Sequence, residues 1–395
     1  MDKNNTAGFA DKLGDVPMVA IYTGHTEGKN QSQHLAYSND KGRSWKKYEK
    51  NPVLDLGLRD FRDPQVFWYE PDKKWVMSVV LAVERKVQFY SSYNLKEWNY
   101  LSSFGPVGDV SGNWECPDLF EVPINGEARK TKWVLMHSPS PYIQYFVGDF
   151  DGIFFKNESP SGKIFRPDYG PDYYAAVVFK NHSADIFPIS IGWVNNWNYA
   201  RDIPTMPWRG AMSLPRLLSL KKVNNEWLLL QEPVTSIELL RSAPTLELKN
   251  LIIEKTITLP VKSQQFELIF SVEPSIDSNF GIRLFSGAGH EMELGYNSTS
   301  QTLYMDRSKT RNSSFNRLFE KLGRYETHLT LDNTLLSLRT FVDNSIVEVF
   351  VNDGRSVMTM QVFPNEVDSG VELFCNQEKI FIENLTLWPI KSVWG

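Results

Sequence analysis

Short runs of alternating hydrophobic and polar residues, separated by turn residues, recur along most of the chain. Residues 18–23 (Met-Val-Ala-Ile-Tyr-Thr) and 34–38 (His-Leu-Ala-Tyr-Ser) have this pattern, and the turn at 39–43 separates the second run from residues 44–48. Runs of this length that are rich in β-branched and aromatic residues and bounded by Gly, Asn, Asp or Pro are typical of β-strands. We therefore predict an all-β protein.

The first half of the chain repeats this pattern with a period of about 50 to 57 residues. Three pairs of residues share an offset of 53: Ser38 and Ser91, Trp45 and Trp98, and Pro64 and Pro117. The outer hairpin recurs more faintly at residues 144–152. Four short strands per repeat at such a period are the signature of a β-propeller, which has about four to eight blades.

Complete blades are predicted at residues 60–110, 113–165 and 172–232, whereas residues 18–50 supply only the outer part of another blade. A closed ring needs more blades than these. The sequence therefore predicts a propeller domain over residues 1–232 that is incomplete at its N-terminus. An open ring exposes strand edges and apolar faces, so we expect a destabilised chain or one that recruits another chain to close the gap.

The repeat stops near residue 233. Residues 233–248 are predicted to form a linker with a short helical turn, and many short strands follow in residues 249–395 with turns such as Asn352-Asp353-Gly354. This pattern indicates a C-terminal β-sandwich. Its acidic residues Asp343, Glu348 and Asp353 are interpreted as solvated strand and turn residues.

Charge and aromatic content limit the classes of partner. The chain has 42 basic and 47 acidic residues and a net charge of −5, which gives no reason to expect nucleic acid or an anionic membrane surface as a partner. Twelve Trp, 16 Tyr and 24 Phe residues suit β-structure and also suit stacking on flat sugar faces. A neutral partner fits better than a charged one, and most of these aromatic rings are expected to lie in the core.

The sequence shows no pattern for a metal site, a disulfide framework or a membrane span. Cys116 and Cys375 lie far apart, and neither they nor the six histidines have metal-ligand spacing. No run approaches the roughly 20 apolar residues of a membrane span, and the first residues contain no apolar signal-peptide segment. We predict no metal or other cofactor, and the compartment stays undetermined.

Two carboxylates begin predicted inner strands, which line the central channel of a propeller. We expect Asp63 and Glu115 at equivalent points of successive blades. Hydrolysis of a glycosidic bond needs one protonated carboxyl group and a second carboxylate. Trp114 and Cys116 should withdraw Glu115 from water and raise its pKa, whereas Arg62 should keep Asp63 ionised. A purely structural ion pair between Arg62 and Asp63 stays open as the alternative.

Five motifs in order resemble glycoside hydrolase family 32, the invertases, inulinases and levanases. The motifs are residues 61–64 (Phe-Arg-Asp-Pro), 114–118 (Trp-Glu-Cys-Pro-Asp), 172–176 (Asp-Tyr-Tyr-Ala-Ala), 192–197 (Gly-Trp-Val-Asn-Asn-Trp) and 207–213 (Pro-Trp-Arg-Gly-Ala-Met-Ser). Residues 342–354 are similar to the C-terminal sandwich of that family. The resemblance covers nearly the whole chain.

The resemblance implies a five-bladed propeller followed by a β-sandwich, and retaining hydrolysis of sucrose or of fructans such as levan and inulin, without metal or organic cofactor. It implies that Glu115 is the general acid/base and Asp63 the transition-state stabiliser, with Arg62 contacting fructosyl hydroxyls. Tyr174 and Trp193 match positions near the sugar site. From the residues alone, Trp193, Trp197 and Trp208 are either stacking platforms or core.

The sequence departs from the family in one important motif. The family nucleophile is an Asp in a Trp-Met-Asn-Asp-Pro-Asn-Gly segment of the first blade, and residues 1–395 contain no such segment. Residues 2–9 resemble a segment partway through the second blade, so we expect the first blade and the nucleophile to be missing. Asp118 and Asp172 are conceivable replacements, but nothing in the sequence favours either.

Three functions remain open. The first is a β-fructofuranosidase-type glycosidase that is inactive or weakly active as this chain. The second is a non-catalytic fructan-binding or scaffold protein derived from such an enzyme. The third is another propeller glycosidase that cleaves arabinan or xylan, against which the Arg-Asp-Pro and Glu-Cys-Pro motifs argue. Substrate preference, endo or exo action and oligomeric state stay undetermined, partly because the loop at residues 136–141 is shorter than in many relatives.

Overall fold

The computed structural model describes residues 1–179, 187–331, 335–376 and 379–394. Its contacts divide the chain into two compact units, each of which is described by itself. Unit 1 comprises Met1–Arg166, Ala175–Pro188 and Ser219–Trp227, and unit 2 comprises Pro167–Tyr174, Ile189–Leu218 and Leu228–Gly395. Within the described residues, no helix has the length and apolar character needed to cross a membrane.

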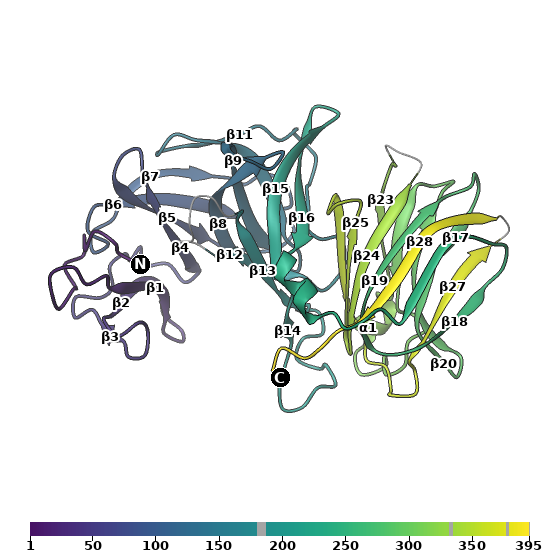
Figure 1. Cartoon of the computed structure of the whole chain (residues 1–395). Coiled ribbons are helices and arrows are strands. Elements are labelled where there is room, and N and C mark those ends of the chain that lie inside the picture. Colours follow the sequence, from purple (N-terminus) through teal and green to yellow (C-terminus); the bar gives the residue numbers. More distant parts are fainter. Residues whose placement is uncertain (180–186, 332–334, 377–378, 395) are drawn as a thin grey trace. The chain divides into compact units, whose positions relative to one another are not determined.

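Unit 1 is built from consecutive antiparallel sheets, as the repeat predicts (Figure 1). The first sheet has the order β1-β2-β3, the second β4-β5-β6-β7, and the third contains β8 to β11 as neighbours. The first two sheets consist of β1 (Met18–His25), β2 (Gln31–Ser38), β3 (Lys46–Lys47), β4 (Phe61–Tyr69), β5 (Lys74–Leu81), β6 (Lys86–Ser92) and β7 (Asn99–Phe104). The third contains β8 (Trp114–Ile124), β9 (Glu127–Pro139), β10 (Gln144–Phe150) and β11 (Phe155–Asn157).

The 53-residue offset corresponds to a repeated local structure. The indole nitrogen of Trp45 donates to the carbonyl oxygen of Gly42 at 3.0 Å, and that of Trp98 donates to Leu95 at 3.1 Å. Gly42 and Leu95 both have left-handed backbone conformations, with φ of 84° and 61°. The two hairpins therefore share a turn closed by a tryptophan. The offset also makes β1, β2 and β3 the counterparts of β5, β6 and β7.

The segment predicted as a third blade contributes strands to both units. These are β12 (Tyr174–Val178), β13 (Ile189–Val194), β14 (Ala211–Met212), β15 (Arg216–Val223) and β16 (Glu226–Pro233). Part of the third-blade segment, residues 180–186, lies outside the described residues.

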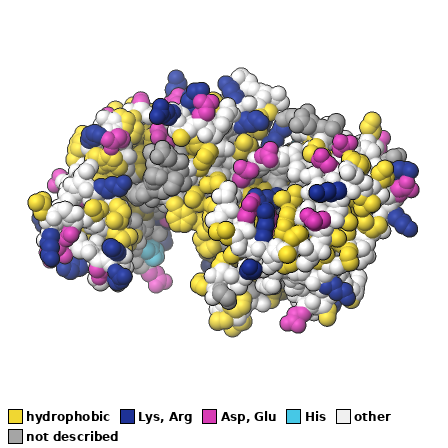
Figure 2. Space-filling view, in the orientation of Figure 1, with side chains coloured by type: hydrophobic (Ala, Val, Ile, Leu, Met, Phe, Trp, Pro, Cys, Tyr) yellow, Lys and Arg dark blue, Asp and Glu magenta, His cyan; other side chains and the backbone are white. Residues whose placement is uncertain are grey.

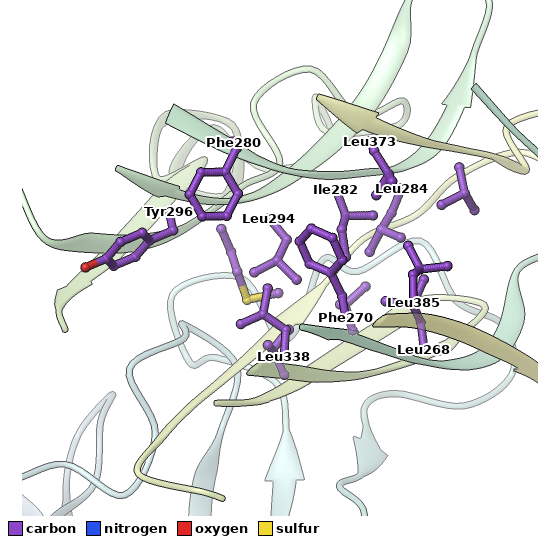
Figure 3. Packing of buried hydrophobic residues seen from close by; sticks show 14 of the residues in the cluster. Leu268, Phe270, Phe280, Ile282, Leu284, Leu294, Tyr296, Leu338, Leu373 and Leu385 are labelled. Atoms are coloured by element: carbon purple, nitrogen blue, oxygen red, sulfur yellow. The ribbon is translucent and has the colours of Figure 1, made fainter. Parts of the chain in front are cut away.

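Unit 2 contains the predicted β-sandwich, two antiparallel sheets with the orders β17-β28-β19-β24-β25-β26 and β18-β27-β20-β21-β22-β23. Buried side chains of the two sheets point toward one another, among them Phe270 and Leu338 on one side and Phe280 and Leu294 on the other (Figure 3). The inward-facing residues of both sheets together form this apolar layer.

Many short strands occupy residues 249–395, as the sequence pattern predicts. The predicted helical turn is the 3₁₀ helix η1 (Thr235–Leu240), and β17 begins inside the segment predicted as linker. The boundary at residues 233–248 stays a prediction. The strands are β17 (Leu246–Ile253), β18 (Ile257–Lys262), β19 (Gln265–Glu273), β20 (Asn279–Gly287), β21 (His290–Asn297), β22 (Thr302–Asp306), β23 (Arg324–His328), β24 (Leu336–Asp343), β25 (Ile346–Val351), β26 (Ser356–Gln361), β27 (Gly370–Asn376) and β28 (Ile380–Pro389), and the one α-helix within the described residues is α1 (Arg317–Lys321).

A buried arginine holds two carboxylates inside unit 2. Arg216 Nη1 lies 3.0 Å from Asp168 Oδ2 and Arg216 Nη2 lies 2.7 Å from Glu348 Oε2, and all three side chains are almost completely excluded from solvent. Glu348 also accepts a hydrogen bond from the Leu214 amide at 2.7 Å. The interpretation of Glu348 as a solvated residue is therefore wrong, because Arg216 and Leu214 cover the face of β25 that carries it, opposite to the core residues Val347 and Val349. Asp343 and Asp353 are exposed.

A buried histidine supports the core of unit 1. His137 is fully buried, its ring centroid lies 3.9 Å from that of Trp114, and its Nε2 accepts a hydrogen bond from the Gln144 amide nitrogen at 3.0 Å. Burial lowers the pKa of His137 from 6.5 to about 3. The ring is therefore neutral in the folded protein at any ordinary pH.

We predict that Arg216→Met destabilises the protein by about 3–5 kcal/mol, because it leaves two buried carboxylates without their cation. Chemical denaturation followed by circular dichroism measures the loss. Asp353→Asn, at an exposed turn residue, is the control and should change stability by less than about 0.5 kcal/mol. A similarly small effect of Arg216→Met would contradict the role of this ion pair.

We predict that His137 makes the protein sensitive to acid. Because its pKa is lower in the folded than in the unfolded chain, the unfolded chain binds the proton first. The stability that His137 contributes is complete above its unfolded pKa of 6.5 and is lost as the pH falls toward its folded pKa of about 3. Between about pH 7 and about pH 4.5, wild type should lose about 2–3 kcal/mol more than His137→Gln.

The measurement is a set of urea unfolding curves at both pH values, with the exposed His25→Gln as control. An equal pH dependence for wild type and His137→Gln would show that the buried ring does not cause the effect.

Candidate active site

Two β-bulges shape the inner strands of successive sheets in unit 1. The register between β4 and β5 shifts between Arg62 and Gln65, and the register between β8 and β9 shifts between Glu115 and Asp118. Such an irregularity bends a strand and re-aims its side chains.

Each bulge contains a residue in the left-handed conformation. Asp63 has φ of 62° and Cys116 has φ of 50°, and Ala175 in the third motif has φ of 50°. A non-glycine residue at positive φ is uncommon and persists only where surrounding contacts hold it. Each of the three motifs therefore contains one non-glycine residue with positive φ.

The bulges define which residues are equivalent. Asp63 corresponds to Cys116, and Arg62 corresponds to Glu115, since both pairs are 53 residues apart and occupy the same place in the bulge. The expectation that Asp63 and Glu115 are equivalent is thus wrong by one position. The backbone turn at the bulge, rather than strict equivalence, brings their side chains to one place.

Three predicted site residues meet at these bulges. Arg62 Nη2 donates to Glu115 Oε1 at 2.9 Å, and Arg62 Nε lies 3.9 Å from Asp63 Oδ2. The Cys116 amide donates to Asp63 Oδ2 at 3.0 Å. Arg62 Nη1 also donates to Asp60 at 2.9 Å. The ion pair between the two sheets is therefore Arg62–Glu115, whereas the contact of Arg62 with Asp63 is longer and lies within one strand.

The surroundings of Glu115 differ from those expected. Trp114 is completely buried on the other side of β8, where its indole nitrogen donates to the Asp109 carbonyl oxygen at 2.9 Å. Successive side chains in a strand point to opposite faces, so Trp114 belongs to the core instead of forming a wall beside the carboxylate. The Glu115 side chain is 24% exposed and has Arg62 as its ionic partner.

The ionisation of Asp63 also departs from expectation. We expected Arg62 to hold its pKa low, but burial raises the pKa of Asp63, and the hydrogen bond from the Cys116 amide and the charge of Arg62 oppose this only in part. Burial also raises the pKa of the Cys116 thiol. The thiol therefore stays protonated and is no nucleophile.

The two conceivable replacement nucleophiles are engaged in the fold. In unit 1, Asp118 is buried and its Oδ2 accepts a hydrogen bond from the Val178 amide at 2.8 Å. In unit 2, Asp172 is buried and forms an ion pair of 2.8 Å with Arg307, while it accepts a hydrogen bond from the Tyr199 hydroxyl at 2.6 Å. Both carboxylates thus have structural partners.

The remaining predicted residues form an aromatic group in unit 2. The ring centroids of Tyr174 and Trp193 are 6.3 Å apart, and those of Trp193 and Trp197 are 5.0 Å apart. Trp193 is half-buried, whereas Trp197 and Trp208 are 51% and 60% exposed. Gly210 packs so closely on Trp193 that a Cβ there would lie 2.2 Å from the indole nitrogen. Tyr174 is buried, so only Trp193 and Trp197 of this contacting group offer ring surface suited to sugar stacking.

Sequence reasoning missed the residues that support Asp63. The Asp63 amide donates to Thr23 Oγ1 at 3.0 Å, Thr23 donates to Gln33 Oε1 at 3.1 Å, and Gln33 Nε2 donates to the Phe61 carbonyl oxygen at 2.8 Å. Thr23 and Gln33 lie in β1 and β2, in the preceding sheet. The available signal was a glutamine at a position that the strand pattern of residues 31–38 buries.

The other features of the described residues are a cavity in unit 2 and a surface of mixed charge. Unit 2 has a cavity of about 430 Å³ lined by residues that include Phe341, Ile390, Gln265 and Lys391. None of the predicted site residues lines it. Basic and acidic side chains are interspersed on the face shown in Figure 2. Among the described residues, no cluster of His, Cys, Asp and Glu could hold a metal ion.

Both halves of the chain match family descriptions. "Glycosyl hydrolases family 32 N-terminal domain" matches residues 2–233, and "Glycosyl hydrolases family 32 C terminal" matches residues 236–389. The resemblance inferred from the five motifs is thereby confirmed.

Curated relatives agree with this match. The levanase of Bacillus subtilis is 43% identical over 410 residues, which cover 100% of this chain and 60% of the levanase. An extracellular exo-inulinase of Aspergillus niger is 36% identical over 92% of this chain and 74% of its own length. The chain thus spans about three fifths of the levanase that it matches.

Solved structures show the fold. The crystal structure of exo-inulinase from Aspergillus awamori superimposes with a TM-score of 0.94 at 32% identity and covers 100% of this chain and 83% of its own. Fructan 1-exohydrolase IIa from Cichorium intybus reaches a TM-score of 0.81 at 22% identity, which bears on the fold alone. The predicted all-β class, propeller type followed by β-sandwich, is confirmed. The chain belongs to glycoside hydrolase family 32.

Proposed function

We propose that the protein derives from a β-fructofuranosidase-type glycosidase that acts on sucrose or on fructans such as levan and inulin. The observation that carries this proposal is the convergence of Arg62, Asp63 and Glu115 at two bulges of the same form in successive sheets. Two carboxyl groups and a guanidinium in one place suit the cleavage of a glycosidic bond.

The relatives support the substrate class. The curated relatives named above are a levanase and an exo-inulinase, and the superimposed crystal structure is an exo-inulinase. These names describe fructan-hydrolysing proteins, and this chain shares their family and their fold. We take a fructosyl unit as the sugar that the site recognises.

In the proposed reaction Glu115 donates a proton to the glycosidic oxygen as the bond to the fructosyl unit breaks, and later accepts a proton from water. For this Glu115 must exchange its ion pair with Arg62 for the glycosidic oxygen. Arg62 is then free to donate to fructosyl hydroxyls, while Asp63 stabilises the positive charge that develops on the sugar.

A retaining reaction also needs a carboxylate nucleophile about 5–5.5 Å from the acid/base. The sequence contains no Trp-Met-Asn-Asp-Pro-Asn-Gly segment, and Asp118 and Asp172 are held by structural contacts. We therefore propose that residues 1–395 by themselves hydrolyse fructosides slowly or not at all. The proposal uses no metal or other cofactor.

The same observation favours a second candidate function, a non-catalytic fructan-binding or scaffold protein. Such a protein would keep Arg62, Asp63 and Glu115 for binding without forming a covalent intermediate. Binding and turnover separate the two candidates, because the enzyme needs both and the binding protein needs only the first.

We predict that purified residues 1–395 release fructose from sucrose, levan or inulin at least about 10³-fold more slowly than the Bacillus subtilis levanase assayed beside them, because the covalent step lacks its nucleophile. Fructose release over time measures this. A rate close to that of the levanase would refute the proposed lack of turnover.

We predict that the same polypeptide binds 1-kestose and that Arg62→Met weakens this binding about 10- to 100-fold, the usual loss for charge-assisted hydrogen bonds. Isothermal titration calorimetry gives the affinity. Arg129→Met, at an exposed arginine of β9 in the same unit, is the matched control and should leave the affinity unchanged. A wild-type polypeptide that binds no fructo-oligosaccharide would count against both candidate functions.

A further inference from the structure

We propose that Thr23 is a positioning residue for the sugar site, and that it acts with Gln33 by fixing the bulge that carries Asp63. The proposal rests on the proposed function, because it assigns Thr23 a role through Asp63 and Glu115. Neither Thr23 nor Gln33 belongs to the motifs that carry the family resemblance.

The bulge creates a need that Thr23 meets. Asp63 lies where the ladder between β4 and β5 shifts register, so its amide needs a partner other than the neighbouring strand. Thr23 Oγ1 accepts this amide at 3.0 Å. With φ of 62°, Asp63 is also in a conformation that only surrounding contacts maintain.

Hydrogen-bond roles fix the direction of every bond in this group. Gln33 Nε2 donates to the Phe61 carbonyl oxygen, so the Gln33 amide oxygen faces Thr23 and must accept from its hydroxyl. The Thr23 oxygen is then left to accept from the Asp63 amide. Gln33 is completely buried. The two residues thus clamp the backbone on both sides of Arg62.

The same arrangement recurs one sheet further on. A side-chain oxygen of Thr23 caps the amide of Asp63 in the next sheet, and a side-chain oxygen of Asp63 caps the amide of Cys116 in the sheet after that, at 3.0 Å in both cases. Both capped residues have left-handed backbones. The three residues form a relay in which each sheet sets the bulge of the next.

The relay explains how Thr23, which lies outside the site, affects binding of the sugar. Without the Thr23 hydroxyl, the amide of Asp63 loses its acceptor and the bulge can rotate. The Asp63 carboxylate then turns away from the Cys116 amide, and Glu115, the residue before Cys116, loses its fixed direction. The geometry therefore points to Thr23 as the first member of a chain that ends at the proposed acid/base.

The test compares Thr23→Val, which keeps the shape and removes the hydroxyl, with Thr23→Ser, which keeps the hydroxyl. Hydrogen–deuterium exchange resolved to single amides should become about tenfold faster or more at Asp63 and Cys116 in Thr23→Val, and stay as in wild type in Thr23→Ser. The Val147 amide in β10, which the Ser159 hydroxyl oxygen accepts at 3.0 Å away from both bulges, should not change.

Binding of 1-kestose provides the functional measurement. Thr23→Val should weaken it about tenfold, whereas Thr23→Ser should restore it. Gln33→Met should act in the same direction as Thr23→Val, because it removes the donor to the Phe61 carbonyl oxygen and the acceptor that orients the Thr23 hydroxyl. Thr131→Val, at an exposed position of β9 in the same unit, is the control that should change neither measurement.

The outcomes distinguish this inference from the proposed function. Unchanged hydrogen–deuterium exchange at the Asp63 amide in Thr23→Val would overturn the clamp, whatever the measured affinity for 1-kestose. Faster exchange with unchanged 1-kestose affinity would overturn the positioning role. A wild-type protein without any affinity for 1-kestose would overturn the proposed function itself, and this is visible before any variant is made.

Discussion

A backbone amide that is not paired in a β-ladder needs another hydrogen-bond acceptor. The candidate site depends on the acceptors that two such amides have, one at each of two bulges. Asp63 and Cys116 both leave their ladders in left-handed conformations, and each amide binds a side-chain oxygen from the preceding sheet. This constraint does two things at once. It ties neighbouring sheets together, and it directs Arg62, Asp63 and Glu115 toward one another.

The candidate site shows how one carboxylate can serve both fold and chemistry. Asp63 accepts a hydrogen bond from the Cys116 amide and so helps to hold the next bulge. Burial of the Asp63 side chain also raises its pKa. Arg62 pairs with Glu115 across the two sheets. A site assembled from backbone turns and a shared guanidinium is well ordered before any sugar arrives, which reduces the free energy that binding must spend on ordering.

In unit 2, buried carboxylates are stabilised by buried arginines. Its buried carboxylates Asp168, Asp172 and Glu348 are neutralised by Arg216 and Arg307, which are almost fully excluded from water. Arg216 joins β15 to β25 of the sandwich, and Arg307 joins Asp172 to a strand end of the sandwich. Segments that precede the predicted linker are therefore bound to the sandwich by ion pairs that local sequence patterns cannot reveal.

The sequence by itself determined the all-β class, the repeated sheets, most strand positions and the residue types of the site. These follow from local periodicity, from turn residues and from a 53-residue offset. The offset reflects a repeated turn, which Trp45 and Trp98 each close by a hydrogen bond. The tertiary structure alone decided that Arg62 pairs with Glu115, that Glu348 is buried, and that Thr23 supports Asp63. Each of these depends on a bulge or on a contact between distant strands, where the two-residue alternation of a strand no longer tells which way a side chain points.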